Sequence, residues 1–266
     1  MEIAVGSRPG VPQCGSDEAY VAEIVAPGIV LLAVAHGFGR IRERSAPAVA
    51  AQTVRDNLKR RVRGERRDPR AALAAAFSAA NARIYAHSGS TDDFVASGTS
   101  LTAALIVGDH AFVGHVGATR AYLGRDGALS SLTTDDALGE GTLRLLTRTL
   151  GTQATLEPSL AHLRLMHGDA LLLSSGALHE LLADDEIADA LRGSASSEDV
   201  TARLLAIAGI RGDGAATVIV GRAFHETSPE VRGKRPPVRE AVLALAAMLA
   251  ATIVAIVMLH ALFSAA

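Results

Sequence analysis

Two adjacent serines, Ser174 and Ser175, precede Gly176 in a chain with nine histidines. Serine and histidine side chains can together perform nucleophilic hydrolysis. The chain lacks the Gly-x-Ser-x-Gly pattern of the strained turn that exposes such a serine. It also lacks the Gly-x-x-x-x-Gly-Lys-Ser/Thr loop that binds nucleotide phosphates. The sequence therefore gives little support to a serine hydrolase or a nucleotide-binding loop.

Histidine and cysteine could also supply metal ligands, but their spacing does not indicate a metal site. Six of the histidines show no paired ligand spacing on one helix and are expected at the surface or in turns: His87, His110, His115, His162, His167 and His179. The single cysteine, Cys14, excludes an intrachain disulfide and a zinc site made of several thiolates.

The composition excludes two broad classes of protein. Hydrophobic residues make up 49% of the 266 residues, and the formal net charge is -2. Wholesale disorder needs low hydrophobicity and high net charge, so the chain is expected to fold. Aromatic residues make up only 3%. Because few aromatic residues can stack on bases and the chain has no net positive charge, we expect no nucleic-acid partner.

The elements that would position these residues follow from apolar spacing and turn signals. Predicted hairpins join 20–25 to 29–35, 100–107 to 110–116, 120–124 to 128–132, and 160–165 to 170–174. Predicted helices cover 45–62, 70–87, 184–191 and 196–207, and a last strand covers 215–220. Strands linked by hairpins, with helices grouped in pairs, favour an α+β fold over alternating βαβ units.

A 19-residue stretch, Ala241–Leu259, carries no charge, and its one polar residue is Thr252. At about 1.5 Å per residue such a helix approaches the ~30 Å hydrocarbon thickness of a bilayer. Core helices are rarely apolar on all sides over this length. We therefore expect a transmembrane helix over 241–263, anchored by Ala241, Leu245, Leu249, Ile253, Ile256 and Leu259.

The segment before this stretch is typical of a linker. Residues 223–240 contain three prolines, and 231–239 hold four positive charges and no acid. No basic residue follows the apolar stretch, and the first residues do not form a signal peptide. By the positive-inside rule, we expect a tail-anchored protein of the cell membrane, with a single span and a cytoplasmic domain over 1–222.

Six segments of this domain resemble, in the same order, motifs of the PPM-type metal-dependent serine/threonine phosphatases, the protein phosphatase type-2C family. They are Ile29–Gly39 (IVLLAVAHGFG), Ser97–Leu105 (SGTSLTAAL), Val113–Leu123 (VGHVGATRAYL), Leu132–Asp136 (LTTDD), His167–Gly176 (HGDALLLSSG) and Gly212–Val220 (GDGAATVIV). The resemblance implies an α-β-β-α sandwich of two antiparallel sheets flanked by helix pairs, which agrees with the α+β prediction.

The resemblance also implies two Mn²⁺ or Mg²⁺ ions, held by aspartates, that activate a bridging water to attack a phosphoryl group. Most of those aspartates are missing here. The corresponding positions hold His36 (followed by Gly37), Ala118, Ser175 and Gly214. The chain is therefore similar to a degenerate member of the family.

Near the N-terminus, the chain keeps one of the carboxylates that the resemblance implies. The family's Asn-Glu-Asp-Ala pattern corresponds to Ser16–Ala19, so a carboxylate survives as Glu18 or its neighbour Asp17. The phosphate-binding arginine of the family corresponds to Gln13, with Arg8 nearby.

A rebuilt metal site is an alternative, in which Glu18, His36 and Asp213 hold one ion. Imidazole suits a softer metal such as Zn²⁺, and a neutral imidazole cannot bridge two ions as a carboxylate does. Asp135 and Asp136 follow two threonines and are expected to lie in a solvated loop.

Together these observations predict a membrane-tethered pseudophosphatase, a binding or regulatory module in phospho-signalling that needs no cofactor. Its expected partner is a protein, either a phosphoprotein or a kinase. The alternative is a divergent protein serine/threonine phosphatase that hydrolyses phosphomonoesters with Mn²⁺ or Mg²⁺. A third possibility is an assembly module without phosphate specificity.

Overall fold

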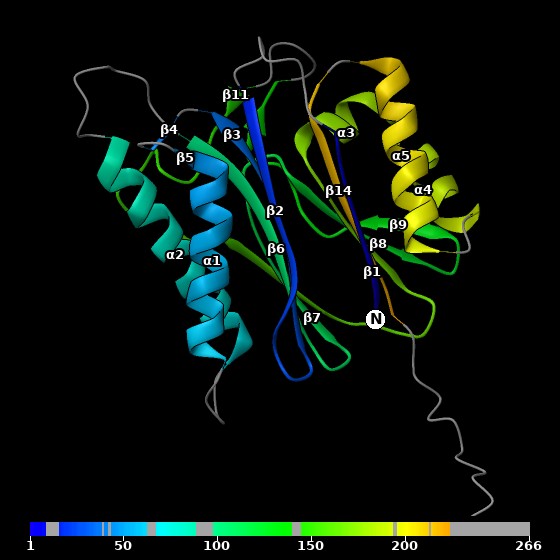
Figure 1. The fold of residues 1–266 in the computed structure, drawn as a ribbon, viewed down its shortest axis with the longest axis horizontal. Coiled ribbons are helices and arrows are strands. Elements are labelled where there is room, and N and C mark those ends of the chain that lie inside the picture. The colour runs from blue at the N-terminus through cyan, green and yellow to red at the C-terminus, as the bar shows by residue number, and fades with distance from the viewer. Residues whose placement is uncertain are drawn as a thin grey trace, which may run out of the picture. The chain divides into compact units, whose positions relative to one another are not determined.

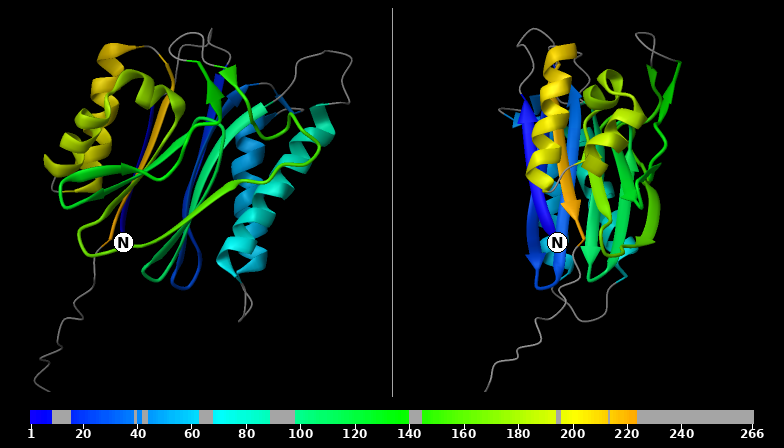
Figure 2. Two further views of the ribbon diagram at one scale, coloured as in Figure 1. Left: turned by 180° about the vertical axis from the view of Figure 1, so that it is seen from behind. Right: turned by 90° about the vertical axis from the view of Figure 1, so that its right-hand side faces the viewer.

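The computed structural model describes residues 1–8, 16–38, 40–41, 44–62, 68–88, 98–139, 145–193, 196–212 and 214–223. Two five-stranded antiparallel sheets lie face to face within this part of the chain, with helices on the outer face of each (Figures 1 and 2). The predicted α-β-β-α sandwich is therefore confirmed.

The first sheet has the strand order β12-β7-β6-β3-β2. Its strands are β2 (Ser16–Ala26), β3 (Ile29–Phe38), β6 (Gly98–Val107), β7 (His110–Val116) and β12 (Ser159–Arg164). The β2–β3 hairpin turns at Gly28, whose φ of 71° is unfavourable for residues with a side chain. Helices α1 (Ala46–Arg61) and α2 (Pro69–Ser88) bury their apolar faces on this sheet around Phe77 and Leu105.

The second sheet has the strand order β1-β14-β13-β8-β9. Its strands are β1 (Glu2–Arg8), β8 (Arg120–Arg125), β9 (Ala128–Ser131), β13 (Ala170–Ser174) and β14 (Ala216–Arg222). Its outer face carries α3 (Gly176–Leu181), α4 (Asp184–Gly193) and α5 (Ser197–Arg211). Helix α5 begins within one residue of the predicted start at 196. Ser196 is its N-cap, and the Ser196 hydroxyl accepts the backbone N–H of Asp199 at 3.1 Å.

A layer of aliphatic side chains joins the two sheets. Leu32 and Val34 come from β3, and they share a buried cluster with Leu171 and Leu173 of β13 and Ile219 of β14. Two short hairpins lie outside the sheets: β4 (Arg40–Ile41) with β5 (Arg44–Ser45), and β10 (Ala137–Leu138) with β11 (Leu145–Leu146).

One predicted hairpin is wrong. Strands β12 and β13 do not pair, because β12 pairs with β7 in the first sheet and β13 pairs with β8 and β14 in the second. The turn between them crosses from one sheet to the other, and Asp169 fixes it. The Asp169 carboxylate accepts two hydrogen bonds from Arg125, at 2.8 and 2.6 Å, and one from the backbone N–H of Met166 at 2.7 Å.

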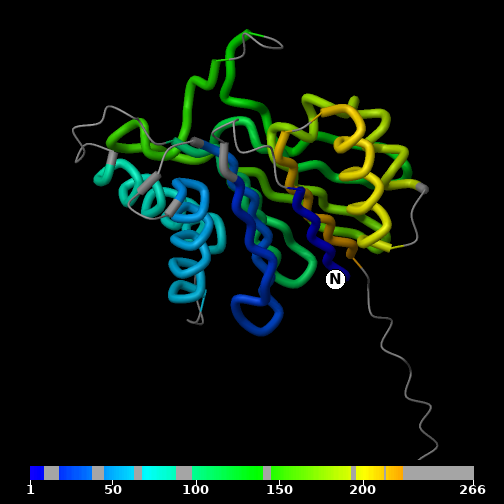
Figure 3. The backbone as a smooth tube through the Cα atoms, turned by 45° about the horizontal axis from the view of Figure 1, so that its top comes forward, coloured from blue at the N-terminus to red at the C-terminus, as the bar shows by residue number. Residues whose placement is uncertain are grey.

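Two elements of the sandwich were not predicted, β1 and α3, and neither were the two short hairpins outside it. Strand β1 pairs along its whole length with β14, more than 200 residues later (Figure 3). Helix α3 has only 6 residues, fewer than a periodic pattern needs to be recognised.

The linker predicted at 223–240 (beyond Ala223) and the transmembrane helix predicted at 241–263 lie outside the described residues. Among the residues that are described, no helix combines the length and the hydropathy needed to cross a membrane.

The turn between β12 and β13, which Asp169 holds in place, leads to a prediction about stability. We expect Asp169→Asn to lower the free energy of unfolding by about 2 kcal/mol, because it weakens hydrogen bonds to a charged group. The side chain of Asp169 is 1% exposed, whereas Arg125 is 31% exposed and keeps partial hydration when the pair is broken. Denaturant unfolding measures the change. Asp126→Asn, at an exposed turn position, is the control and should change stability little; equal effects of the two variants would contradict the assignment.

Candidate functional site

His36 lies near the end of β3, where the first sheet faces the second. Its neighbours across the ladder are Glu18 on β2 and Ser100 on β6. Directly opposite residues on one face of a sheet have side chains within contact distance, so Glu18 and His36 lie side by side. The structure therefore brings together the surviving carboxylate and the histidine that replaces an aspartate.

Gly37 follows His36 and has a packing role. A Cβ atom at Gly37 would overlap the carbonyl oxygen of Gly98 and lie 2.6 Å from the Cα atom of Thr99. The close approach of β3 and β6 therefore requires glycine here, independently of any chemistry at residue 36.

The loop between β7 and β8 brings Ala118 to the same end of the sandwich. The backbone N–H of Ala118 donates to the Ser100 hydroxyl at 3.0 Å, and the N–H of Gly117 donates to Asp136 at 2.9 Å. Gly117 has φ of 97°, in the region that favours glycine. These contacts hold the loop in place, and Ala118 presents a methyl group where the resemblance implies a carboxylate.

Ser175 connects β13 to α3 and is fully buried. Its hydroxyl accepts the backbone N–H of Thr217 at 3.0 Å, and its own N–H donates to the Thr217 carbonyl at 3.0 Å. A Cβ atom at the next residue, Gly176, would lie 3.4 Å from His36 Nδ1 and 3.6 Å from the carbonyl oxygen of Ala118. The imidazole of His36 therefore reaches across to the second sheet, beside the start of α3.

Glu18 also reaches across between the sheets. Thr217 donates its hydroxyl to Glu18 Oε2 at 2.6 Å, and the hydroxyls of Thr217 and Ser7 lie 3.0 Å apart. The other carboxylate oxygen, Oε1, is buried and has no hydrogen-bond partner among the described residues. Sequence reasoning missed Ser7 and Thr217, because nothing local marks two hydroxyls that meet only after β1 and β14 pair.

The remaining candidates are partly described. Gly214 precedes β14, and among the described residues a Cβ atom there would contact Ala177 alone, at 3.6 Å. Asp213, Gln13 and the side chain of Asp17 lie outside the described residues. Arg8 donates to the carbonyl oxygen of Gly212 at 2.6 Å, at the C-terminal end of α5.

Four polar residues are more buried than their sequence context predicted. Asp135 and Asp136 do not form a solvated loop: their side chains are 10% and 14% exposed, and Arg120 and Arg148 pair with them. His115 and His179 are not surface residues, since each is 1% exposed. The Nδ1 atom of His115 lies 2.9 Å from the Thr102 hydroxyl.

Comparison with known proteins decides the family. The family model of protein phosphatase 2C matches residues 15–209. The chain belongs to the protein phosphatase 2C family. A relative of this PP2C-family chain, the serine/threonine protein phosphatase PstP of Mycobacterium tuberculosis, is 32% identical over 256 residues, covering 88% of this chain and 48% of PstP. The chain thus spans about half the length of that relative.

Solved structures agree with the assignment. The crystal structure of M. tuberculosis PstP/Ppp has a TM-score of 0.71 at 29% identity, over 84% of this chain and 99% of that chain. The PstP catalytic domain in complex with two manganese ions has a TM-score of 0.70 at 30% identity, over 84% and 98%. The phosphatase MsPP of Mycobacterium smegmatis, in complex with cacodylate, has a TM-score of 0.70 at 27% identity, over 85% and 99%.

These matches favour the phosphatase alternative at the level of the family, since the relatives are named as phosphatases and one of them holds two manganese ions. They likewise favour Mn²⁺ or Mg²⁺ over the expectation of no cofactor. The described side chains at the positions matched to the family's aspartates, His36, Ala118 and Ser175, do not fit such a pair of ions. Hard divalent cations need anionic oxygen ligands, and the described residues include no cluster of three or more His, Cys, Asp or Glu side chains able to hold a metal.

Burial near the site leads to a prediction about pH. Burial lowers the pKa of His115, and the nearby Asp136 carboxylate only partly opposes this. The unfolded chain therefore binds this proton at a higher pH than the folded protein does. Below about pH 6.5, the usual histidine pKa, the free energy of unfolding should fall with decreasing pH until the folded pKa is passed.

We expect His115→Gln to flatten this dependence, because glutamine can still bond to Thr102 but carries no titrating group. Chemical denaturation at a series of pH values measures the slope. His87→Gln, in the last turn of α2, is the matched control. A slope in His115→Gln equal to that of the original chain would contradict the prediction.

Proposed function

We propose that this chain is a membrane-tethered pseudophosphatase, a PP2C-family domain that binds a protein partner in phospho-signalling without a dinuclear metal centre. The proposal rests on the side chains at three positions that the fold brings to the same end of the sandwich. His36, Ala118 and Ser175 offer an imidazole, a methyl group and a hydroxyl where aspartates are expected.

The chemistry of these side chains supports the proposal. Two adjacent divalent cations carry a charge that several carboxylates must balance. Glu18 is the single carboxylate among the described candidate positions, and Thr217 already donates a hydrogen bond to it. The hydroxyl of Ser175 accepts a backbone N–H, so it helps to hold β13 and α3 in place.

The alternative, a divergent metal-dependent serine/threonine phosphatase, has support of its own. The relatives named above are phosphatases, and Glu18 Oε1, beside His36, is a buried oxygen without a hydrogen-bond partner in the part of the chain that the structure describes. An ion held by Glu18 and His36 would give that oxygen a partner. Asp213 is one residue from Gly214 and would be the third ligand.

Hydrolysis of p-nitrophenyl phosphate by the full 266-residue chain, titrated with Mn²⁺, separates the two functions. We expect no turnover above the metal-only rate. Metal-dependent turnover that His36→Ala abolishes would overturn the pseudophosphatase and support the alternative.

A restored variant is the matched control: His36→Asp, Ser175→Asp and Gly214→Asp together. Two of these positions suit the change: Ser175 is at the N-cap of α3, a position where aspartate is favoured, and among the described residues a Cβ at Gly214 would meet Ala177 at an ordinary contact distance of 3.6 Å. We expect this variant to gain Mn²⁺-dependent turnover. Turnover by the restored variant alone would indicate that the pocket persists and only its ligands are lost.

The proposal includes attachment to the cytoplasmic face of the membrane by residues 241–263, with a phosphoprotein or a kinase as the partner. Support comes from the uncharged 19-residue stretch and from the four basic residues before it.

Membrane fractionation with alkaline extraction tests the attachment. We expect the chain to stay in the membrane pellet. Leu249→Arg with Ile253→Arg should release it, because each arginine at the centre of a span costs about 3 kcal/mol. The control pair, Leu249→Ala with Ile253→Ala, should stay in the pellet. Release of the unaltered chain by alkali would contradict the anchor.

A further inference from the structure

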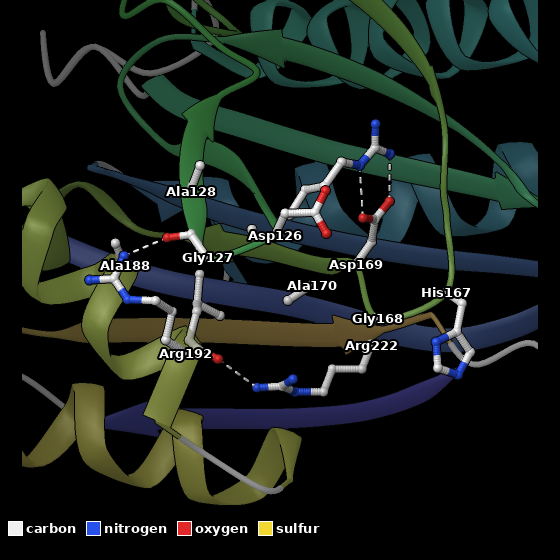
Figure 4. A pocket seen from close by; sticks show the side chains of 13 residues that line it. Asp126, Gly127, Ala128, His167, Gly168, Asp169, Ala170, Ala188, Arg192 and Arg222 are labelled. Carbon is white, nitrogen blue, oxygen red and sulfur yellow. Dashed lines mark hydrogen bonds and ion pairs between the residues drawn. The ribbon is translucent and has the colours of Figure 1, made fainter.

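A second candidate site lies at the far end of the sheet that carries Ser175. Strand β13 has its first residue, Ala170, opposite Gly124 and Arg222, and its last residue, Ser174, opposite Arg120. The candidate site described above, with Glu18, His36 and Ser175, lies at the Ser174 end and is called the family site from here on. A pocket of about 310 Å³ lies at the Ala170 end, between the β8–β9 turn, the turn at 167–169, α4 and the end of β14 (Figure 4).

Three arginines from three elements line this pocket. Arg125 ends β8, Arg192 is in the last turn of α4, and Arg222 ends β14. Figure 4 shows Arg192 extending toward the turn at Gly127 and Arg222 extending from β14 toward α4. The fold thus brings three arginines that are far apart in the sequence to the lining of one pocket.

Hydrogen bonds to the protein hold each guanidinium in place. Arg125 forms a two-pronged pair with Asp169. Arg192 donates to the carbonyl oxygen of Gly127 and pairs with Asp189, and Arg222 donates to the carbonyl oxygen of Leu191 at 2.9 Å. Because these side chains are already ordered, a ligand would lose less conformational entropy in binding to them.

The guanidinium N–H groups of the lining suit an anion. The lining has three arginines and two aspartates, Asp126 and Asp169; Arg125 is paired with Asp169, and Arg192 is paired with Asp189, which lies outside the lining. Gly127 and Gly168 also line the pocket, and because glycine has no side chain, the turns present backbone at these two positions. A Cβ atom at Gly168 would contact nothing within 4 Å.

We propose that this pocket binds a phosphate group, carried either by a small soluble molecule or by a lipid headgroup. Guanidinium groups match phosphate in geometry, because each offers a rigid fork of N–H donors. Groups that come from different elements can reach different oxygens of a tetrahedral anion. The proposal does not depend on whether the family site has activity.

Calorimetric titration of the full chain in detergent with inorganic phosphate, at constant ionic strength, tests the proposal. We expect saturable binding that Arg192→Gln or Arg222→Gln weakens by about tenfold, since each variant removes a charged hydrogen-bond donor. Arg203→Gln, the same change at an exposed position of α5, is the matched control and should bind normally. Equal affinity in all three variants would overturn the proposal.

Hydrogen–deuterium exchange on the unaltered chain gives a second measurement that needs no variant. Protection of 124–128 and 167–170 on adding inorganic phosphate would support a soluble ligand. The same protection in nanodiscs that contain phosphatidylglycerol, and not in nanodiscs of phosphatidylcholine alone, would support a lipid headgroup. No change in these segments under either condition would overturn the proposal.

Discussion

The packing of the two sheets on each other is the constraint on which the rest of this structure depends. The chain has no tryptophan and few aromatic residues, so aliphatic side chains such as Leu32, Leu171 and Ile219 form the layer between the sheets. Burial of apolar side chains such as these is the main favourable contribution to the free energy of folding. It also sets the distance across which His36 meets Gly176 and Glu18 meets Thr217. Residues from both sheets form the family site, so the site exists only when the layer is packed.

Under the proposed function, this dependence explains how the PP2C-family fold persists without the aspartates of its site. Gly37 and Gly117 are required by backbone contacts and φ angles, and Ser175 binds backbone groups of Thr217. None of these needs a metal ion. The aspartates contribute charge to the site, whereas the packing contributes the fold, so one can change without loss of the other. Fold and function are separable in this sense.

Local signals predicted most of the strands, helices and turns, and long-range contacts account for what was missed. Gly28 and the Asp126-Gly127 pair marked true hairpins, because such turns need only their own residues. The turn at His167-Gly168-Asp169 looked similar but joins two sheets, a distinction that lies in the pairing partners. The burial of His115 depends on neighbours such as Thr102 in the adjacent strand, which no local pattern of the sequence reveals. The convergence of Glu18, His36 and Ser175 was predictable only through resemblance to a family.

The pairing of β1 with β14 affects how the domain is made. During synthesis the first strand leaves the ribosome long before its partner, and β14 is the central link between β1 and β13. Until Ala216–Arg222 is available, β1 has no ladder and β13 has an open edge. Unpaired edges of this kind promote association between chains. Nascent chains that stop before β14 would therefore be prone to aggregation, and the sheet is complete only once Ala216–Arg222 has been synthesised.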